Sequence, residues 1–114
     1  MKLSELAEKY TFHDSLVYSL ERDIDNDQFI MKIELCNWAQ EYYTSNMDEN
    51  ISVTLTFSNV KEVRGDAIKV DLNGISTCDV LEGSIVFFLI RDYADGDGGV
   101  DELQIWADEV TVNP

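Results

Sequence analysis

Apolar residues recur at helical spacing near the start of the chain. Four of them lie at positions i, i+3, i+4 and i+7, on one face of a helix: Leu3, Leu6, Ala7 and Tyr10. Ser4 is available as the cap of this helix. Beyond this segment the period of the pattern changes from 3.6 to 2, so the sequence predicts one short N-terminal helix followed by strands.

Alternation of apolar and polar residues predicts three strands in the first half of the chain. In residues 16–21 and 29–36 every second residue is apolar, and residues 23–27 between them are rich in Asp and Asn. Because such residues tolerate turn geometry, we expect the two strands to form a hairpin. Residues 51–58 carry the clearest alternation in the chain and predict a strand with one dry face and one wet face.

The second half of the chain continues this pattern. Residues 68–72 alternate and are followed by Asn73 and Gly74, a pair that suits the positive φ angles of a tight turn. Residues 84–90 are apolar at both odd and even positions. This composition is typical of a central strand that is covered on each side.

The last predicted strand covers residues 103–112, and the apolar residues that would face the core change from odd to even positions along it. One extra residue near Asp108 and Glu109 would keep all of them on the core side, which predicts a β-bulge or a bend there. In total six or seven strands and one helix are expected. The predicted fold is mainly β, an antiparallel β-sandwich or partly closed barrel with one short N-terminal helix, formed by residues 1–114 as a single domain.

Composition agrees with one packed domain in the cytoplasm. Apolar residues make up 45% of the 114 residues, enough for one hydrophobic core. The two cysteines, Cys36 and Cys78, lie far apart and outside any CxxC pair, so reduced, buried thiols are expected in place of a disulfide or metal site. The first residues lack the pattern of a signal peptide, and the longest apolar run, 85–90, is too short to cross a bilayer.

The charge balance indicates which partners suit the chain. Eight Lys and Arg residues stand against 23 Asp and Glu residues, a formal net charge of -15. Such a surface repels nucleic acid and anionic membranes and accelerates encounter with a basic protein. High acidity that serves solubility alone is the competing explanation.

The only histidine of the chain lies in the segment Phe12-His13-Asp14-Ser15, where the predicted helix gives way to strands. A histidine beside a carboxylate can act as a general base, which suggests a small hydrolase or metal-dependent enzyme. Adjacent residues of an extended chain point to opposite sides, however, which argues against a hydrogen-bonded pair. We therefore favour a structural motif, with Phe12 in the core and Asp14 and Ser15 bonded to backbone groups.

Four carboxylates occupy positions 1, 3, 5 and 12 of an EF-hand pattern: Asp23, Asp25, Asp27 and Glu34. Position 6, which needs glycine for its sharp turn, is Gln28, and the flanks alternate like strands where an EF-hand has helices. Calcium binding is therefore not predicted here.

A second acidic segment, residues 92–102, combines carboxylates with glycines. Its members proposed for partner binding are Asp92, Asp95, Asp97 and Asp101. Oxygen ligands on a loop can hold a hard cation, but turn-forming residues in an acidic protein explain the same composition. We predict no metal or other cofactor for this chain.

Residues 37–50 have no clear period and contain three aromatic residues among polar ones: Trp38, Tyr42 and Tyr43. Exposed aromatic residues ringed by polar groups are typical anchors of a protein interface. The alternative is a loop that folds its rings back onto the core. The phosphate-binding and hydrolase motifs with recognisable spacing are missing from the sequence, so enzymatic activity is not predicted.

One group of known proteins shares several of these short motifs. They comprise the segment 12–15, then Val17, Leu20 and Arg22, a strand that leads into Trp38, and residues 53–57 with Val60. In these features, over residues 12–75, the chain resembles small all-β bacterial immunity proteins that open with an FHD segment. The resemblance implies a protein that binds and blocks a toxin, without assigning contact residues.

Three alternative hypotheses about function follow from the sequence. The first is an intracellular immunity-type protein that binds a basic toxin through acidic loops and the aromatic residues of 37–50. The second is the small enzyme centred on His13 and Asp14. The third is an accessory domain with a partner unrelated to toxins.

Overall fold

A computed structural model describes residues 1–65, 68, 70, 73–91 and 99–114 of the chain. Within this part, a single α-helix precedes eight strands, and a 3-10 helix at Asn37–Ala39 follows the second strand. The elements are α1 (Leu3–Lys9), β1 (Leu16–Asp23), β2 (Gln28–Cys36), β3 (Asn50–Ser58), β4 (Glu62–Arg64), β5 (Asn73–Leu81), β6 (Ser84–Ile90), β7 (Val100–Trp106) and β8 (Glu109–Asn113).

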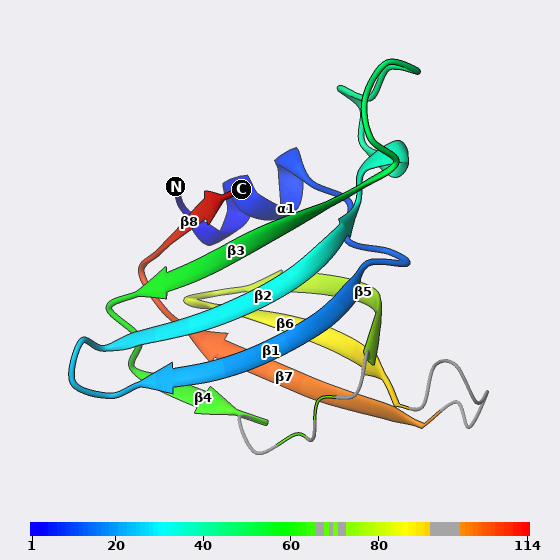
Figure 1. The fold of residues 1–114 in the computed structure, drawn as a ribbon. Coiled ribbons are helices and arrows are strands. Elements are labelled where there is room, and N and C mark those ends of the chain that lie inside the picture. The colour runs from blue at the N-terminus through cyan, green and yellow to red at the C-terminus, as the bar shows by residue number, and fades with distance from the viewer. Residues whose placement is uncertain (66–67, 69, 71–72, 92–98) are drawn as a thin grey trace.

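All eight strands belong to one antiparallel sheet with the order β4-β7-β6-β5-β1-β2-β3-β8. The link between β5 and β1 is short, since the register pairs only Leu16 with Gly74 and Val17 with Asn73. The sheet folds over at this link into two layers (Figure 1). We call β1, β2, β3 and β8 the front half and β4, β5, β6 and β7 the back half. The mainly β fold with one short N-terminal helix is thus confirmed, and the sheet is not closed into a barrel.

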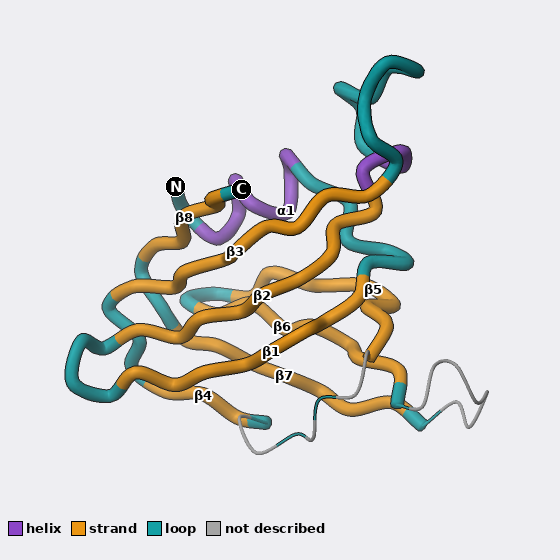
Figure 2. Tube along the Cα trace, viewed as in Figure 1, coloured by secondary structure: helices purple, strands orange, loops and turns teal. Residues whose placement is uncertain are grey.

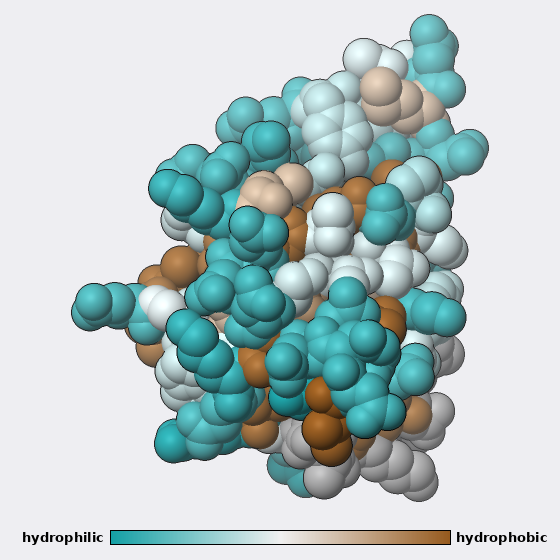
Figure 3. All heavy atoms as spheres, turned by 90° about the vertical axis from the view of Figure 1, so that its left-hand side faces the viewer, coloured by the Kyte–Doolittle hydropathy of each residue, from teal (hydrophilic) through white to brown (hydrophobic). Residues whose placement is uncertain are grey.

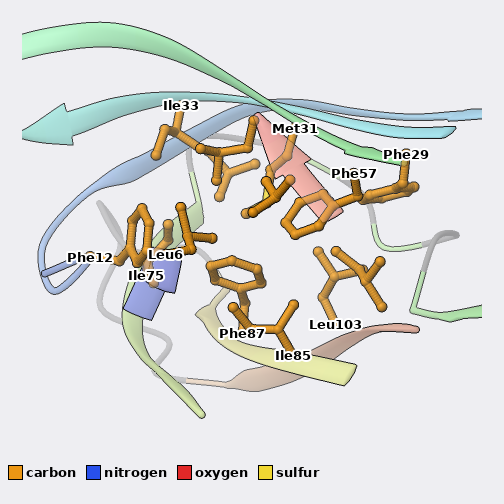
Figure 4. Close-up of a cluster of buried hydrophobic side chains, with 14 of the residues drawn as sticks. Leu6, Phe12, Phe29, Met31, Ile33, Phe57, Ile75, Ile85, Phe87 and Leu103 are labelled. Carbon is orange, nitrogen blue, oxygen red and sulfur yellow. The ribbon is translucent and has the colours of Figure 1, made fainter. Parts of the chain in front are cut away.

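The hydrophobic core lies between the two halves (Figure 4). Phe87 of β6 stands at its centre, with its ring edge-on to Phe12 at 5.7 Å and to Phe57 at 6.3 Å between centroids. Helix α1 contacts β5 and β8 and adds Leu3 and Leu6 to the core. The helical face predicted from the sequence is therefore the face that anchors α1.

The cap of α1 differs from the prediction. Lys2 is the N-cap, and its backbone N–H donates to Oε1 of Glu5 at 3.2 Å. Ser4 lies inside the helix instead of capping it. A carboxylate in the first helical turn stabilises the end of the helix where N–H groups lack partners, so Glu5 takes the role expected of Ser4.

The predicted hairpin of β1 and β2 is present, with an irregularity that the alternation did not reveal. Val17 pairs with Ile33 and Ser19 pairs with Lys32, so Tyr18 is an extra residue in β1. Val17 is consequently buried, whereas Tyr18 is 45% exposed. A bulge of this kind reverses which residues of a strand face the core.

The predicted turn at Asn73 and Gly74 is wrong. Both residues are buried in β5, and Gly74 is not among the glycines with positive φ. The tight turn instead joins β5 to β6 at Glu82-Gly83, where Gly83 has φ 75°. The preceding predicted strand, 68–72, falls largely on residues 69 and 71–72, which lie outside the described residues.

The predicted irregularity near Asp108 is a bend that separates two strands. Before it, β7 pairs with β6 and β4 in the back half, and after it, β8 pairs with β3 in the front half. Ala107 at this corner is buried, and Asp108 is exposed. This division, together with β4 and β5, raises the strand number from the six or seven expected to eight in the described residues.

Candidate partner-binding site on the aromatic loop

Residues 37–49, which we call the aromatic loop, connect β2 to β3 and stand away from the sheet (Figure 2). The base of this loop is held by buried Asn37. The backbone N–H of Asn37 donates to the carbonyl oxygen of Glu49 at 2.8 Å, and its side-chain Nδ2 donates to that of Asp48 at 2.8 Å. Asn37 therefore joins the start of the loop to its end.

Gln40, also buried, ties the loop to the segment that follows α1. Its Nε2 donates to the carbonyl oxygens of Thr11 at 2.6 Å and Cys36 at 2.9 Å. Its Oε1 accepts a hydrogen bond from the backbone N–H of Thr11 at 2.8 Å. Because a buried amide is costly to leave unpaired, these bonds fix the position of the loop base. No pattern in the sequence marks Asn37 or Gln40 as buried.

The aromatic residues predicted here lie at the surface to different degrees. Trp38 is 55% exposed and Tyr42 is 43% exposed, while Tyr43 is half-buried. Met47 is 41% exposed on the same loop, although no motif of the sequence marks it. The rings of Trp38 and Tyr42 are thus not folded back into the core.

Tyr42 is held in place although its ring is exposed. Its hydroxyl donates to Oδ1 of Asn37 at 2.6 Å, and its ring stands edge-on to Tyr10 at 6.4 Å. Partial burial raises the pKa of the Tyr42 hydroxyl, with a smaller contribution from Tyr10. The phenol therefore remains a neutral donor at neutral pH, and Asn37 fixes both the loop base and this ring.

Charge in the aromatic loop has one sign. Glu41, Asp48 and Glu49 are exposed carboxylates, and residues 37–49 contain no Lys or Arg. Hydrophilic residues also dominate the side of the molecule that carries the β1–β2 turn (Figure 3). The exposed rings of Trp38 and Tyr42 therefore lie on a loop whose charged side chains are all negative.

The segment Phe12-His13-Asp14-Ser15 has a structural role at three of its positions. Phe12 is buried in the core. Oγ of buried Ser15 accepts a hydrogen bond from the backbone N–H of Cys36 at 2.9 Å. The backbone N–H of Asp14 donates to the carbonyl oxygen of Ile75 at 3.0 Å. The segment therefore fastens the start of β1 to both β2 and β5.

His13 and Asp14 meet, contrary to the expectation for an extended chain. Asp14 has φ 66°, so the backbone turns here, and His13 Nε2 lies 3.5 Å from Asp14 Oδ1. Nδ1 of His13 donates to the carbonyl oxygen of Ser76 at 2.7 Å, which places a hydrogen on this nitrogen. The side chains of His13 and Asp14 are 65% and 43% exposed.

A shallow pocket of about 210 Å³ borders His13. Its other lining residues include Tyr10, Ser76 and Cys78. Burial, and to a lesser extent the negative charge of Asp79, raises the pKa of the Cys78 thiol to about 11. A thiol with this pKa is protonated at neutral pH and is a poor nucleophile.

Of the four acidic candidates in residues 92–102, one lies in the described part of the chain. Asp101 lies in β7 and not in a loop, and its Oδ2 is 3.3 Å from Nε of Arg91. Asp92, Asp95 and Asp97 lie outside the described residues. In the β1–β2 turn Asp23 accepts a hydrogen bond from the Asn26 side chain at 2.8 Å. In the described part of the chain, no group of three or more His, Cys, Asp or Glu residues gathers to hold a metal ion.

No protein-family model, curated protein or solved structure matches this chain. The resemblance to immunity proteins is therefore a prediction from the sequence motifs alone. Among the described residues, no helix has the length and apolar content needed to cross a membrane.

Proposed function

We propose that this chain is a non-catalytic binding protein that works inside the cell and holds a basic partner protein on its aromatic loop. The observation that carries the proposal is the exposure of Trp38 and Tyr42 on a loop whose base is fixed by buried Asn37 and Gln40. Large rings on a fixed support lose little conformational entropy when a partner covers them. They are therefore effective anchors of an interface.

Charge supports a basic partner. The net charge of -15 attracts a cationic protein over distance, and Glu41, Asp48 and Glu49 place carboxylates beside the rings. The motifs around residues 12–15 and Trp38 supply a more specific proposal, in which the partner is a secreted bacterial toxin and this chain is its immunity protein. A nuclease toxin is basic where it holds its substrate, so an acidic inhibitor can occupy that surface.

The experiment compares two variants in binding to the basic proteins encoded beside the gene for this chain. Trp38→Ala removes the most exposed ring of the aromatic loop. Ile24→Ala is the matched control, since Ile24 is 73% exposed but lies in the β1–β2 turn. We expect Trp38→Ala to weaken binding by about 2 kcal/mol, roughly 30-fold in Kd by calorimetry, and Ile24→Ala to leave it unchanged.

Two outcomes would count against the proposal. One is that none of the neighbouring basic proteins is retained at low salt. The other is that both variants bind as tightly as the parent. Binding that depends on Trp38 but involves a neighbouring protein without toxic activity would support the accessory-domain alternative, with the same loop as its interface.

The enzyme alternative has two observations in its favour. His13 Nε2 lies 3.5 Å from Asp14 Oδ1, and a pocket with Ser76 and Cys78 at its wall borders His13. Two features argue against catalysis at this pocket. The His13 and Asp14 side chains are both exposed to water, and the Cys78 thiol has a raised pKa. An ester-hydrolysis assay in which His13→Ala abolishes turnover would reverse this preference.

A further inference from the structure

The outer side of the back half carries a line of apolar residues. Along β6, Ile85, Phe87 and Leu89 belong to the core, so the residues that alternate with them face outward. The register places residues of β5 and β7 beside them on the same side. We call this set the apolar outer face, and its members are Leu81, Val86, Phe88, Ile90, Val100 and Trp106.

These residues are not part of the hydrophobic core. Val86 is only 6% exposed, yet it lies outside the core cluster, and half-buried Phe88 is not packed against that cluster. Leu81 and Val100 are 52% and 53% exposed. The sequence predicts that β6 is covered on both sides. At its start this holds, because the outward-facing Ser84 and Val86 are 1% and 6% exposed, whereas Phe88 and Ile90 further along are half-buried. In the described residues, its strand neighbours are β5 and β7, and the core lies on its inner side.

Carboxylates flank the apolar outer face. Asp79 of β5 is paired with Val86, and Glu102 of β7 is paired with Phe88, so one negative charge lies on each side of the β6 line. On β4, Glu62 is paired with Trp106, and the guanidinium of Arg64 lies 4.9 Å from the Trp106 ring centroid. The apolar outer face is therefore bounded mainly by negative charge.

We propose that the apolar outer face is a second docking surface, and that its occupant is a protein segment whose apolar side chains are flanked by Lys or Arg. The apolar outer face would take the side chains, and Asp79 and Glu102 would pair with the cations. A second copy of this chain would bring its own charge of -15 and the same carboxylates, which repel. The surface is separate from the aromatic loop, so the inference goes beyond the proposed function.

Trp106 allows a direct test. The chain has two tryptophans, so Trp38→Phe leaves Trp106 on the apolar outer face as the sole tryptophan. The probe is a synthetic amphipathic helical peptide of Leu and Lys, and its counterpart has Glu in place of Lys. We expect the Lys peptide to bind saturably and to shift the Trp106 emission to shorter wavelength, and the Glu peptide to do neither.

Matched substitutions distinguish binding at the apolar outer face from non-specific attraction of a cationic peptide to an acidic protein. Phe88→Thr and, independently, Val100→Thr remove apolar groups from the face without changing the charge. Ile30→Thr removes a half-buried apolar group from the front half, where Ile30 pairs with Thr56. Each of the first two should weaken binding of the Lys peptide about tenfold, and the third should leave it within about twofold. Val100 is exposed, so its variant retains the fold.

Three results would overturn the inference. The Lys peptide binds all three variants equally, or it binds without any change in Trp106 emission, or sedimentation shows that the free protein dimerises and that Phe88→Thr makes it monomeric. The last result would identify the occupant as a second copy. None of these outcomes bears on Trp38, so the aromatic loop is tested separately.

Discussion

The two outer faces of the sheet differ in composition although each lies above the same core. On the front half, β3 and β8 present hydroxyl and amide side chains outward. These residues are Ser52, Thr54, Thr56, Ser58, Thr111 and Asn113. On the back half, β6 presents Val86, Phe88 and Ile90. A sheet that is covered on one side needs a polar outer face. The outer side of β3 and β8 therefore matches what folding in water requires, and the outer side of β6 does not. The difference indicates that the apolar outer face serves binding.

The largest expected effect compares two adjacent phenylalanines of β6. Phe87→Ala opens a cavity between Phe12 and Phe57 and should lower the free energy of unfolding by about 3–5 kcal/mol. Phe88→Thr replaces an outward ring with a residue that favours strands and should lower it by about 1 kcal/mol or less. Urea denaturation measures both values. Equal losses would mean that Phe88 serves stability as Phe87 does, which would remove the basis for a docking surface.

Much of the fold could be predicted because alternation reports directly on burial. Residues 51–58, which alternate, match β3 closely, and the continuous apolar run 84–90 matches β6. The hairpin of β1 and β2 follows from the turn residues between them. The start of β5 could not be predicted in this way. Asn73 and Gly74 favour a turn locally, but pairing with Val17 and Leu16 of β1 places them in the sheet. Tertiary pairing outweighed a local preference there.

The aromatic residues of the candidate site could be predicted from the sequence, but the hydrogen bonds that hold the loop in place could not. Trp38 and Tyr42 are recognisable as possible anchors in any polar segment. Asn37 and Gln40 are polar residues in the same segment, and no pattern marks them as buried, because their partners are backbone groups as far away as Thr11. The pairing of His13 with Asp14 was missed for a related reason, since it depends on the positive φ of Asp14.

Two valines with the same exposure give a smaller and sharper comparison. Val53 of the front half and Val86 of the back half are each 6% exposed, but only Val53 belongs to the core. Val53→Thr places a hydroxyl in the core and should lower the free energy of unfolding by about 1–3 kcal/mol. Val86→Thr should lower it by roughly 0.5 kcal/mol, since Gln104 and Asp79 on the two neighbouring strands offer polar partners to the hydroxyl.

Thermal and urea unfolding of both variants, beside the parent, would test this pair. If Val86→Thr destabilises the protein as much as Val53→Thr, the outer side of β6 is sealed within the folded chain. The contrast between the two outer faces would then reflect folding and not binding.

The smallest effect concerns a polar contact on the front face. The hydroxyl of Tyr18 donates to Oε2 of Glu34, and this hydrogen bond, followed by weak desolvation and the charge of Glu34, raises the pKa of Tyr18 above 10.0. Because the folded state favours the neutral phenol, the contact makes its full contribution to the free energy of unfolding below pH 10.0. This contribution is lost as the pH rises through the raised pKa.

Glu34→Gln removes the charge and should return the pKa of Tyr18 toward its ordinary value. Absorbance at alkaline pH reports on all five tyrosines, so the difference between the parent and Glu34→Gln isolates Tyr18, and Tyr18→Phe is the control in which this difference disappears. Superimposable titration curves for the parent and Glu34→Gln would contradict the contact. The stability change caused by Phe88→Thr should not vary over the same pH range, because a phenylalanine and a threonine do not titrate there. A pH-dependent contact on the front face and a pH-independent one on the back face would show that the two faces differ in the forces they use as well as in composition.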